Sequence, residues 1–137
     1  MLGYLFDKNN SKASLRRLCQ RAFATLEPGG LLVFDLAEPN RSMSREPTHR
    51  IEEDWAVLVR FENNPRRKQL TRYITTFRKF GKNYRRHEEV HRVQLYDPAE
   101  IATMLREIGF RVRRSRKYGD FPLLESTTAF IARKPLK

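Results

Sequence analysis

Residues 26–36, Leu-Glu-Pro-Gly-Gly-Leu-Leu-Val-Phe-Asp-Leu, constrain the fold more than any other stretch. Pro28 cannot continue a helix, and Gly29 and Gly30 allow the positive φ that a sharp chain reversal needs. The apolar run that follows, up to Asp35, is typical of a strand that is covered on both faces, as in a parallel α/β sheet. The stretch therefore predicts a helix end, a tight turn and a buried strand over 31–36.

The residues before this turn predict an amphipathic helix over 11–26, in which apolar side chains recur every three or four positions. Asn10 or Ser11 is the expected N-cap, because both side chains can accept the free amides of a first helical turn. Cys19 falls on the apolar face and predicts a buried thiol rather than a nucleophile. The face is formed by Leu15, Leu18, Cys19, Ala22, Phe23 and Leu26.

A second helix is predicted over 98–108. Asp97 is its expected N-cap, Pro98 stands at the first helical position and Gly109 follows the last one. Beyond it, alternating residues predict strands over 110–116 and 127–133, with a loop at 118–122. Together with the strand over 31–36, these elements predict a small α/β sheet with helices packed against it.

Between the two helices, segment 51–96 is predicted to be an inserted antiparallel β-meander of three strands, which extends or caps the α/β sheet. Alternating runs begin near Trp55, Leu70 and Tyr84, and the turn residues Asn63-Asn64-Pro65 and Gly81-Lys82-Asn83 separate them. Residues 37–50 lack periodicity and predict a long loop, which is a common place for functional residues.

The composition is strongly basic, with 28 Lys and Arg against 16 Asp and Glu, for a formal net charge of +12. The basic residues are spread along the predicted elements, so we interpret them first as an Arg-rich solvated surface. A single cysteine excludes an internal disulfide and a cysteine-only metal site. No stretch has the length of a membrane span or the pattern of a signal peptide, so the expected location is cytoplasmic.

The order of these features resembles the C-terminal half of a class I S-adenosylmethionine-dependent methyltransferase. In that family an L-x-P-G-G turn, here residues 26–30, leads into the fifth strand. A Gly-Phe turn, here Gly109-Phe110, leads into the sixth, and a seventh strand inserts antiparallel between them. The resemblance implies a partial Rossmann-like methyltransferase fold over 1–137, with the inserted meander as a substrate cap.

The resemblance also implies S-adenosylmethionine as cofactor, but the family's glycine-rich first half has no counterpart here. The six glycines form no G-x-G pattern, and such a loop wraps the cofactor with its backbone, as in dinucleotide folds. We therefore expect a truncated or split enzyme that is inactive without an N-terminal half. Tyr4, Leu5 and Phe6 match a family loop that borders the cofactor, although with the first half absent we favour their being core residues left uncovered.

For the substrate, the candidate residues are His87, His91 and Tyr118. His87 and His91 alternate on one strand face with Glu89 between them, a pattern that could bind a metal or move protons. The more common meaning is an exposed face crossed by charge pairs, so we predict no metal site. The opposite face, Arg86-Glu88-Val90-Arg92, is expected to form cross-strand pairs.

Two functions from different classes remain open. One is a methyltransferase acting on a small molecule; the other is a basic α+β module whose sheet holds nucleic acid through Arg, Lys and aromatic side chains. No nucleic-acid motif is present, and the arginines alternate with glutamates. A bare sheet edge also predicts a homodimer or domain-swapped assembly over the surface of the missing half. No membrane partner is expected.

Overall fold

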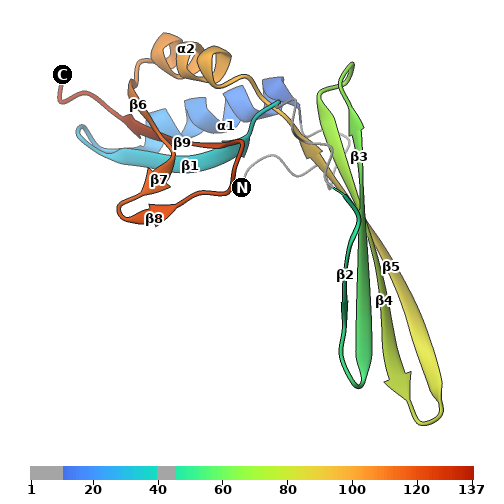
Figure 1. The fold of residues 1–137 in the computed structure, drawn as a ribbon. Helices are drawn as coiled ribbons and strands as arrows, with labels where there is room; N and C mark the ends of the chain where they lie inside the picture. The colour runs from blue at the N-terminus through green and yellow to red at the C-terminus, as the bar shows by residue number, and fades with distance from the viewer. Residues whose placement is uncertain (1–10, 40–45) are drawn as a thin grey trace.

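A computed structural model describes residues 11–39 and 46–137 of the 137-residue chain (Figure 1). The predicted residues Tyr4, Leu5 and Phe6, the possible cap Asn10 and part of the predicted 37–50 loop lie outside the described residues. The elements are α1 Lys12–Thr25, β1 Leu31–Ala37, β2 Thr48–Ile51, β3 Trp55–Asn64, β4 Gln69–Phe80, β5 Asn83–Gln94, α2 Pro98–Ile108, β6 Arg111–Ser115, β7 Lys117–Tyr118, β8 Phe121–Pro122 and β9 Thr127–Arg133.

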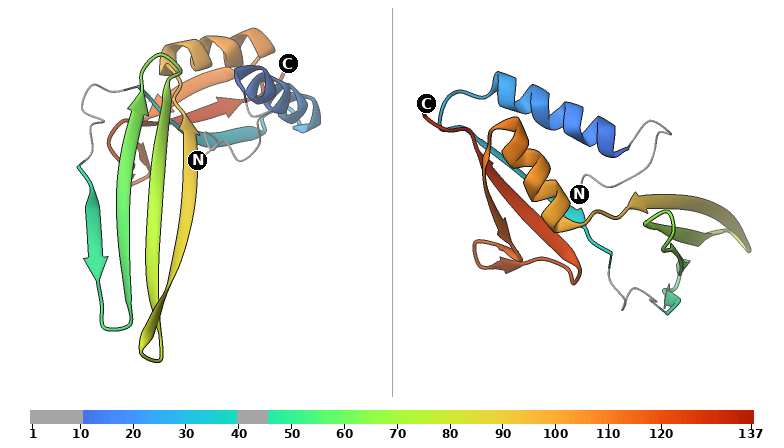
Figure 2. Two further views of the ribbon diagram at one scale, coloured as in Figure 1. Left: turned by 90° about the vertical axis from the view of Figure 1, so that its right-hand side faces the viewer. Right: turned by 90° about the horizontal axis from the view of Figure 1, so that it is seen from above.

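The first and last parts of the chain form an α/β unit. Its sheet has the strand order β1-β9-β6, and β9 runs antiparallel to both neighbours. Helices α1 and α2 lie together on one face of this sheet (Figures 1 and 2). Their apolar faces meet the strands in one core, which contains Cys19 and Leu105 from the helices and Phe34 and Phe130 from the strands. This arrangement confirms the predicted sheet, with its last strand inserted in the middle.

The local signals at the helix ends have the expected geometry. Ser11 is the N-cap of α1, and its Oγ accepts the Ser14 amide at 3.3 Å. Asp97 caps α2 by accepting the Ala99 amide at 2.8 Å. Gly29 has a φ of 84° and donates its amide to Lys134 O at 2.8 Å, so the predicted turn is also tied to the end of β9.

Segment 48–94 forms a separate sheet of four strands in the order β2-β3-β4-β5, which extends away from the α/β unit (Figure 1). The predicted three-stranded meander over 51–96 was therefore one strand short. The missing strand, Thr48–Ile51, lies where a loop was predicted, and all its residues are exposed. It is an edge strand held to β3 by backbone pairing, so it lacks the apolar alternation by which strands are recognised.

A second correction concerns the loop predicted at 118–122. Two short strands, β7 and β8, pair there as a hairpin around Gly119, with Tyr118 opposite Phe121. Each strand has only two residues, which is too short for a period-2 pattern to be seen in the sequence.

The two parts of the molecule meet at a small apolar cluster. Leu70 and Val93 from the four-stranded sheet pack with Ala37 at the end of β1 and with Leu95. The Tyr96 amide also donates to Ala37 O at 2.9 Å. The sheet is thus anchored at one end, directly after β1, while its far end has no helix against it (Figures 1 and 2).

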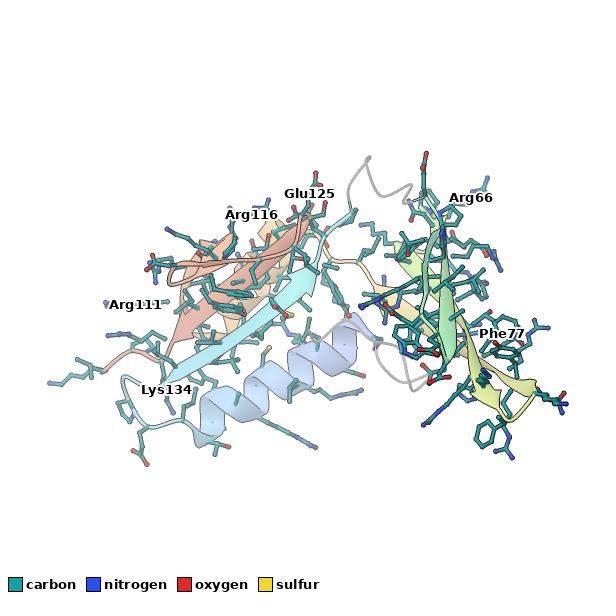
Figure 3. All side chains as sticks on the ribbon, turned by 60° about the horizontal axis from the view of Figure 1, so that its bottom comes forward. Arg66, Phe77, Arg111, Arg116, Glu125 and Lys134 are labelled. Atoms are coloured by element: carbon teal, nitrogen blue, oxygen red, sulfur yellow. The ribbon has the colours of Figure 1, made fainter. Side chains whose placement is uncertain are left out.

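The arginines are spread over both parts of the molecule, as the sequence predicts. Arg66 at one end of the four-stranded sheet and Arg111 at the edge of the α/β sheet both point outward (Figure 3). Neither of the two described helices is long and apolar enough to cross a membrane.

Candidate functional site

The first candidate site is a hollow of about 470 Å³ at the free edge of β1. Leu18 and Ala22 of α1 line one side of it, Val33 and Asp35 lie on β1, and Tyr118 of β7 completes the lining. β1 reaches this position because it is the outer strand of its sheet, with β9 on its other side. The hollow therefore joins a strand edge that pairs with no other described strand to apolar side chains and one carboxylate.

Tyr118 is the sequence-predicted substrate residue that lies in this hollow. Burial raises the pKa of its hydroxyl, and the nearby Asp35 carboxylate raises that pKa further. Both causes keep the phenol protonated at neutral pH, so the hydroxyl is available as a hydrogen-bond donor. The strand carrying Asp35 runs two residues beyond it, to Ala37, which is slightly longer than the sequence indicated.

A polar cluster directly after β1 was not predicted from the sequence. Arg116 Nη1 lies 2.6 Å from Glu38 Oε1, and Thr128 donates its hydroxyl to Glu38 Oε2 at 2.7 Å. Arg116 also donates to Thr127 O. These bonds fix the chain as it leaves β1 for the four-stranded sheet. The sequence placed Arg116 only within a run of basic residues, since 78 positions separate it from Glu38.

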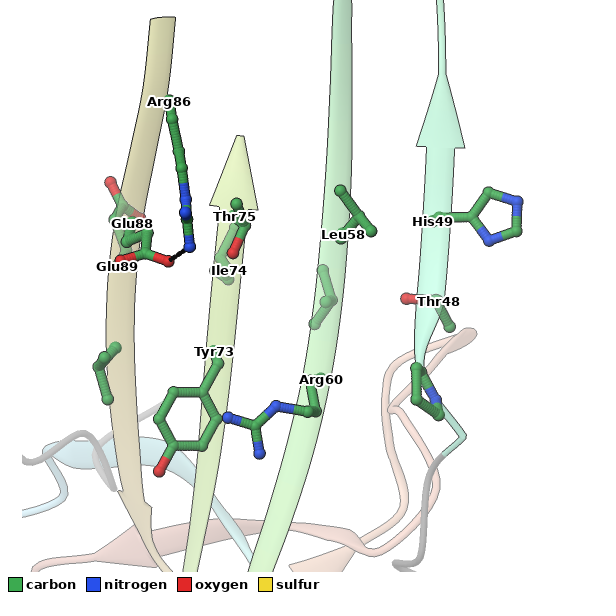
Figure 4. A pocket seen from close by; sticks show the side chains of 13 residues that line it. Thr48, His49, Leu58, Arg60, Tyr73, Ile74, Thr75, Arg86, Glu88 and Glu89 are labelled. Atoms are coloured by element: carbon green, nitrogen blue, oxygen red, sulfur yellow. Dashed lines mark hydrogen bonds and ion pairs between the residues drawn. The ribbon is translucent and has the colours of Figure 1, made fainter. Parts of the chain in front are cut away.

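The second candidate site is a hollow of about 680 Å³ on one face of the four-stranded sheet (Figure 4). The register places Leu58, Thr75 and Glu88 in one row across this face, and Arg60, Tyr73 and Val90 in the next. The Arg60 guanidinium lies over the Tyr73 ring at 4.1 Å, and the Tyr73 hydroxyl donates to Glu62 at 3.0 Å. Arg86 is paired with Glu88.

His87 and His91, the other predicted substrate residues, lie on the opposite face of the same sheet, which they share with Val57 and Val59. The Glu89 carboxylate lies between them, 3.4 Å from His87 Nε2 and 3.2 Å from His91 Nε2. Arg72 on β4 contacts the other ring nitrogen of His91 at 3.3 Å. The structure thus brings the two histidines together but places Tyr118 on a different sheet.

One expectation about this strand can be compared directly with its contacts. In the part of the chain that the structure describes, no group of three or more His, Cys, Asp or Glu is arranged to hold a metal ion. On the face predicted to form cross-strand pairs, Arg86 and Glu88 instead pair with each other along β5, whereas Val90 lies opposite Tyr73 on β4. The neighbours of Arg86 and Glu88 on β4, Phe77 and Thr75, carry no charge, so a pair across the strands is not available.

Two of the aromatic side chains on which the nucleic-acid alternative relies carry arginines on their rings. Tyr73 carries Arg60 on its ring, and Phe80 carries Arg85 at 4.2 Å. A base that stacked on either of these rings would first have to displace the arginine. The described geometry gives this alternative no specific support.

No family model matches the chain, and no curated protein matches it. Solved structures do match. A crystal structure of an S-adenosylmethionine-dependent methyltransferase from Clostridium acetobutylicum aligns with a TM-score of 0.74 at 14% identity, covering 98% of this chain and 55% of that one.

Two further solved structures of methyltransferases also align with most of this chain. The methyltransferase CcbJ from Streptomyces caelestis aligns at a TM-score of 0.71 and 17% identity, covering 98% of this chain and 53% of its own. The sugar N-methyltransferase KedS8 from Streptoalloteichus aligns at 0.73 and 17% identity, covering 91% and 50%. The chain therefore spans about half the length of the structures it matches.

Proposed function

We propose that this chain, which has the fold of about half of an S-adenosylmethionine-dependent methyltransferase, works as the C-terminal half of such an enzyme. The observation that carries the proposal is the sheet order β1-β9-β6 with β9 antiparallel in the middle, together with its superposition on these enzymes over 98% of the chain. Neither the fold nor the comparisons favour the nucleic-acid alternative.

S-adenosylmethionine is the proposed cofactor, and one similar structure, of the amino pentose methyltransferase CalS10, has it bound. The described residues of this chain do not form a complete site for it, since none of the glycines provides a G-x-G loop. Tyr4, Leu5 and Phe6 remain proposed cofactor contacts. We infer that a glycine-rich half completes the site, and we derive no catalytic step from this chain alone.

The free edge of β1 is the proposed docking position for that half. Leu31 and Val33 are exposed to 46% and 48%, and Leu18 on α1 is exposed to 47%. An unpaired strand edge flanked by apolar side chains is well suited to the addition of another strand. The sequence also predicted a homodimer or domain-swapped assembly over this surface. That assembly stays a proposal, and the variant Val33→Lys described below would test it.

The proposed acceptor is a small molecule, and an amino sugar is the first class to test. One similar structure is described as a sugar N-methyltransferase and another as an amino pentose methyltransferase. The four-stranded sheet is the proposed substrate cap, and His87, His91 and Tyr118 remain the proposed substrate contacts. A cytoplasmic location accompanies this proposal, because the chain has a single cysteine and no disulfide.

Calorimetric titration tests the cofactor half of the proposal. S-adenosylmethionine or S-adenosylhomocysteine titrated into the 137-residue chain should give no heat at ~1 mM ligand, which corresponds to binding weaker than about −4 kcal/mol. A fusion that places the first half of the Clostridium acetobutylicum methyltransferase before Met1, so that Tyr4, Leu5 and Phe6 are kept, should bind in the micromolar range. It should also transfer a radiolabelled methyl group to an amino-sugar acceptor.

The junction is tested by Val33→Lys in the same fusion, with Val57→Lys as the matched control. A lysine at this exposed edge position should abolish cofactor binding by blocking the strand junction, while Val57→Lys on the four-stranded sheet should leave binding intact. Stoichiometric cofactor binding by the chain alone would show that the site needs no glycine-rich half. A folded fusion that binds no cofactor would overturn the methyltransferase proposal.

A further inference from the structure

We propose that the free edge of β6 binds an acidic polypeptide segment in extended conformation, which adds to the three-stranded sheet as a further strand. The binding surface, called here the arginine edge, consists of Arg111, Arg113 and Arg114 on β6 together with Arg133 on the neighbouring strand β9. It lies on the opposite side of this sheet from the β1 edge. The proposal therefore does not depend on the proposed enzymatic function.

Strand β6 has an open backbone edge. In the order β1-β9-β6 it is an outer strand, and among the described residues it pairs only with β9 (Figure 1). In an antiparallel strand, every second residue directs its amide and carbonyl groups toward one neighbour, and the residues between direct theirs to the other side. The outward groups of β6 are therefore available to the backbone of an incoming strand.

The side chains along this edge are basic and exposed. Arg111, Arg113 and Arg114 are all exposed, whereas Val112 packs against the core of the α/β unit. Figure 3 shows Arg111 pointing outward. Neither β6 nor β9 contains an acidic residue. An incoming strand therefore meets positive charge on both of its faces.

These charges are not neutralised within the described part of the chain. The register places Arg111 directly opposite Arg133, and Arg113 follows two positions along on the same face. Like charges directly opposite each other in a sheet are destabilising. Among the described residues, none of the four arginines of this edge enters an ion pair, whereas Arg16 and Arg116 of the same unit do. A partner that brings carboxylates to this face replaces the repulsion by attraction.

The alternation of side chains along β6 defines the pattern of the partner. Arg111 and Arg113 lie on one face of the strand, and Val112 lies on the other. Because paired strands share a period of two, a complementary segment has acidic residues at positions i and i+2 with an uncharged residue between them. A second copy of β6 is excluded, since it would place arginines beside arginines.

The arginine edge suits a polypeptide better than a nucleic acid. Strand β6 contains no aromatic residue on which a base could stack. A nucleic acid would also leave the outward amide and carbonyl groups of β6 without strand partners, whereas an extended peptide pairs with them at regular intervals. Charge selects an acidic partner, and the backbone edge selects one in strand conformation.

Fluorescence anisotropy with the full 137-residue chain tests the proposal. The probe is a fluorescein-labelled octapeptide of alternating Glu and Thr, and we expect a dissociation constant of about 10 to 100 μM at ~50 mM salt. Arg111→Glu combined with Arg113→Glu should weaken binding at least tenfold. The matched control, Arg66→Glu with Arg67→Glu in the exposed β3–β4 turn, makes the same change in net charge and should alter binding less than about twofold. Circular dichroism of both variants confirms that they are folded.

Two N-methylated probes test strand addition on the wild-type chain. One carries N-methyl groups on its Glu residues and the other on its Thr residues, so both keep the charge of the original peptide. Strand pairing uses the amides of one alternating set, so one probe should lose binding at least tenfold while the other retains it. No binding at ~1 mM peptide, equal binding of both N-methylated probes, or equal losses in the two double variants would each overturn the proposal. Tighter binding of a 12-nucleotide single-stranded DNA that Arg111→Glu with Arg113→Glu abolishes would overturn it as well, because the partner would then be a nucleic acid.

Discussion

At the scale of single residues, the burial of Cys19 should make the stability of the α/β unit depend on pH. Its side chain is fully buried, and burial raises the pKa of its thiol from 9.0 to about 11. A group whose pKa is higher in the folded state stabilises the fold below its unfolded pKa. This contribution is lost as the pH rises from about 9 through 11, because the unfolded thiol then releases its proton first.

We therefore expect Cys19→Ala to have a flatter stability profile than the wild type between pH 8 and pH 11. The wild type should lose about 2 kcal/mol more of its unfolding free energy over this range. Urea denaturation at several pH values measures the difference, and the constant cost of the smaller side chain cancels in the comparison. Parallel profiles for the two proteins would show that the thiol ionises as freely in the fold as in the unfolded chain.

Gly109 gives a second prediction at this scale. It ends α2 with a φ of 122°, and a Cβ at this position would lie 2.8 Å from Cζ of Phe23. That ring packs edge-on against Phe110 with 4.9 Å between the ring centroids, so it has little freedom to move. We expect Gly109→Ala to cost more than ~2 kcal/mol of unfolding free energy.

Gly81 is the matched control for this substitution. It also has a positive φ, of 60°, but a Cβ there would meet no atom within 4 Å. Gly81→Ala should therefore cost only about 1 kcal/mol, the backbone part of the effect. Thermal or urea unfolding of both variants separates the steric contribution of Phe23 from the backbone contribution, and equal costs would contradict the predicted clash.

At the scale of elements, α1 receives its C-terminal cap from the other end of the chain. Its last turn has no basic residue. Lys134, just after β9, donates its ammonium group to Phe23 O at 2.8 Å and to Leu26 O at 2.7 Å. The positive charge satisfies two free carbonyls and also interacts favourably with the negative end of the helix dipole.

Replacing this lysine should uncouple the helix end from β9. Lys134→Met keeps the apolar stem but removes the donor, and we expect a loss of about 1 to 2 kcal/mol in unfolding free energy. Lys137→Met removes the same charge from an exposed position and should change stability by less than ~0.5 kcal/mol. Chemical denaturation of the two variants measures both values, and an equal effect would mean that net charge, not the cap, is responsible.

The elements also show what the sequence could predict. The Pro28-Gly29-Gly30 turn, the Ser11 and Asp97 caps and the alternating runs of β3 to β5 depend on neighbouring residues, so they were predicted correctly. Strand β2 and the Lys134 cap depend on contacts with distant parts of the chain, which a local pattern does not encode. The Glu38–Arg116 pair beside β1 was not predicted for the same reason.

The candidate sites were predicted to a similar extent. The spacing of His87, Glu89 and His91 placed three side chains on one strand face, and the structure has them in contact. The face opposite to them carries the larger hollow, and no local pattern indicated it. A concave surface results from the twist of several strands, and residues such as Leu58 and Val90 become neighbours of the hollow only through the register.

At the scale of the whole molecule, stability should be unequal between its two parts. The α/β unit has a core made by two helices and a sheet, while the four-stranded sheet is anchored at one end through a small cluster around Leu70 and Val93. Its far end, near Phe80 and Asn83, has no helix against it (Figure 2). Local opening there should need much less free energy than opening of β9.

Amide hydrogen exchange measures this difference directly. At ~1 μM protein, we expect the β4–β5 turn region to exchange at least 100-fold faster than the amides of β9, whose residues Thr127 to Phe130 are all buried. Protection that is uniform across both sheets would show that the four-stranded sheet is as stable as the α/β unit, and it would contradict the predicted inequality.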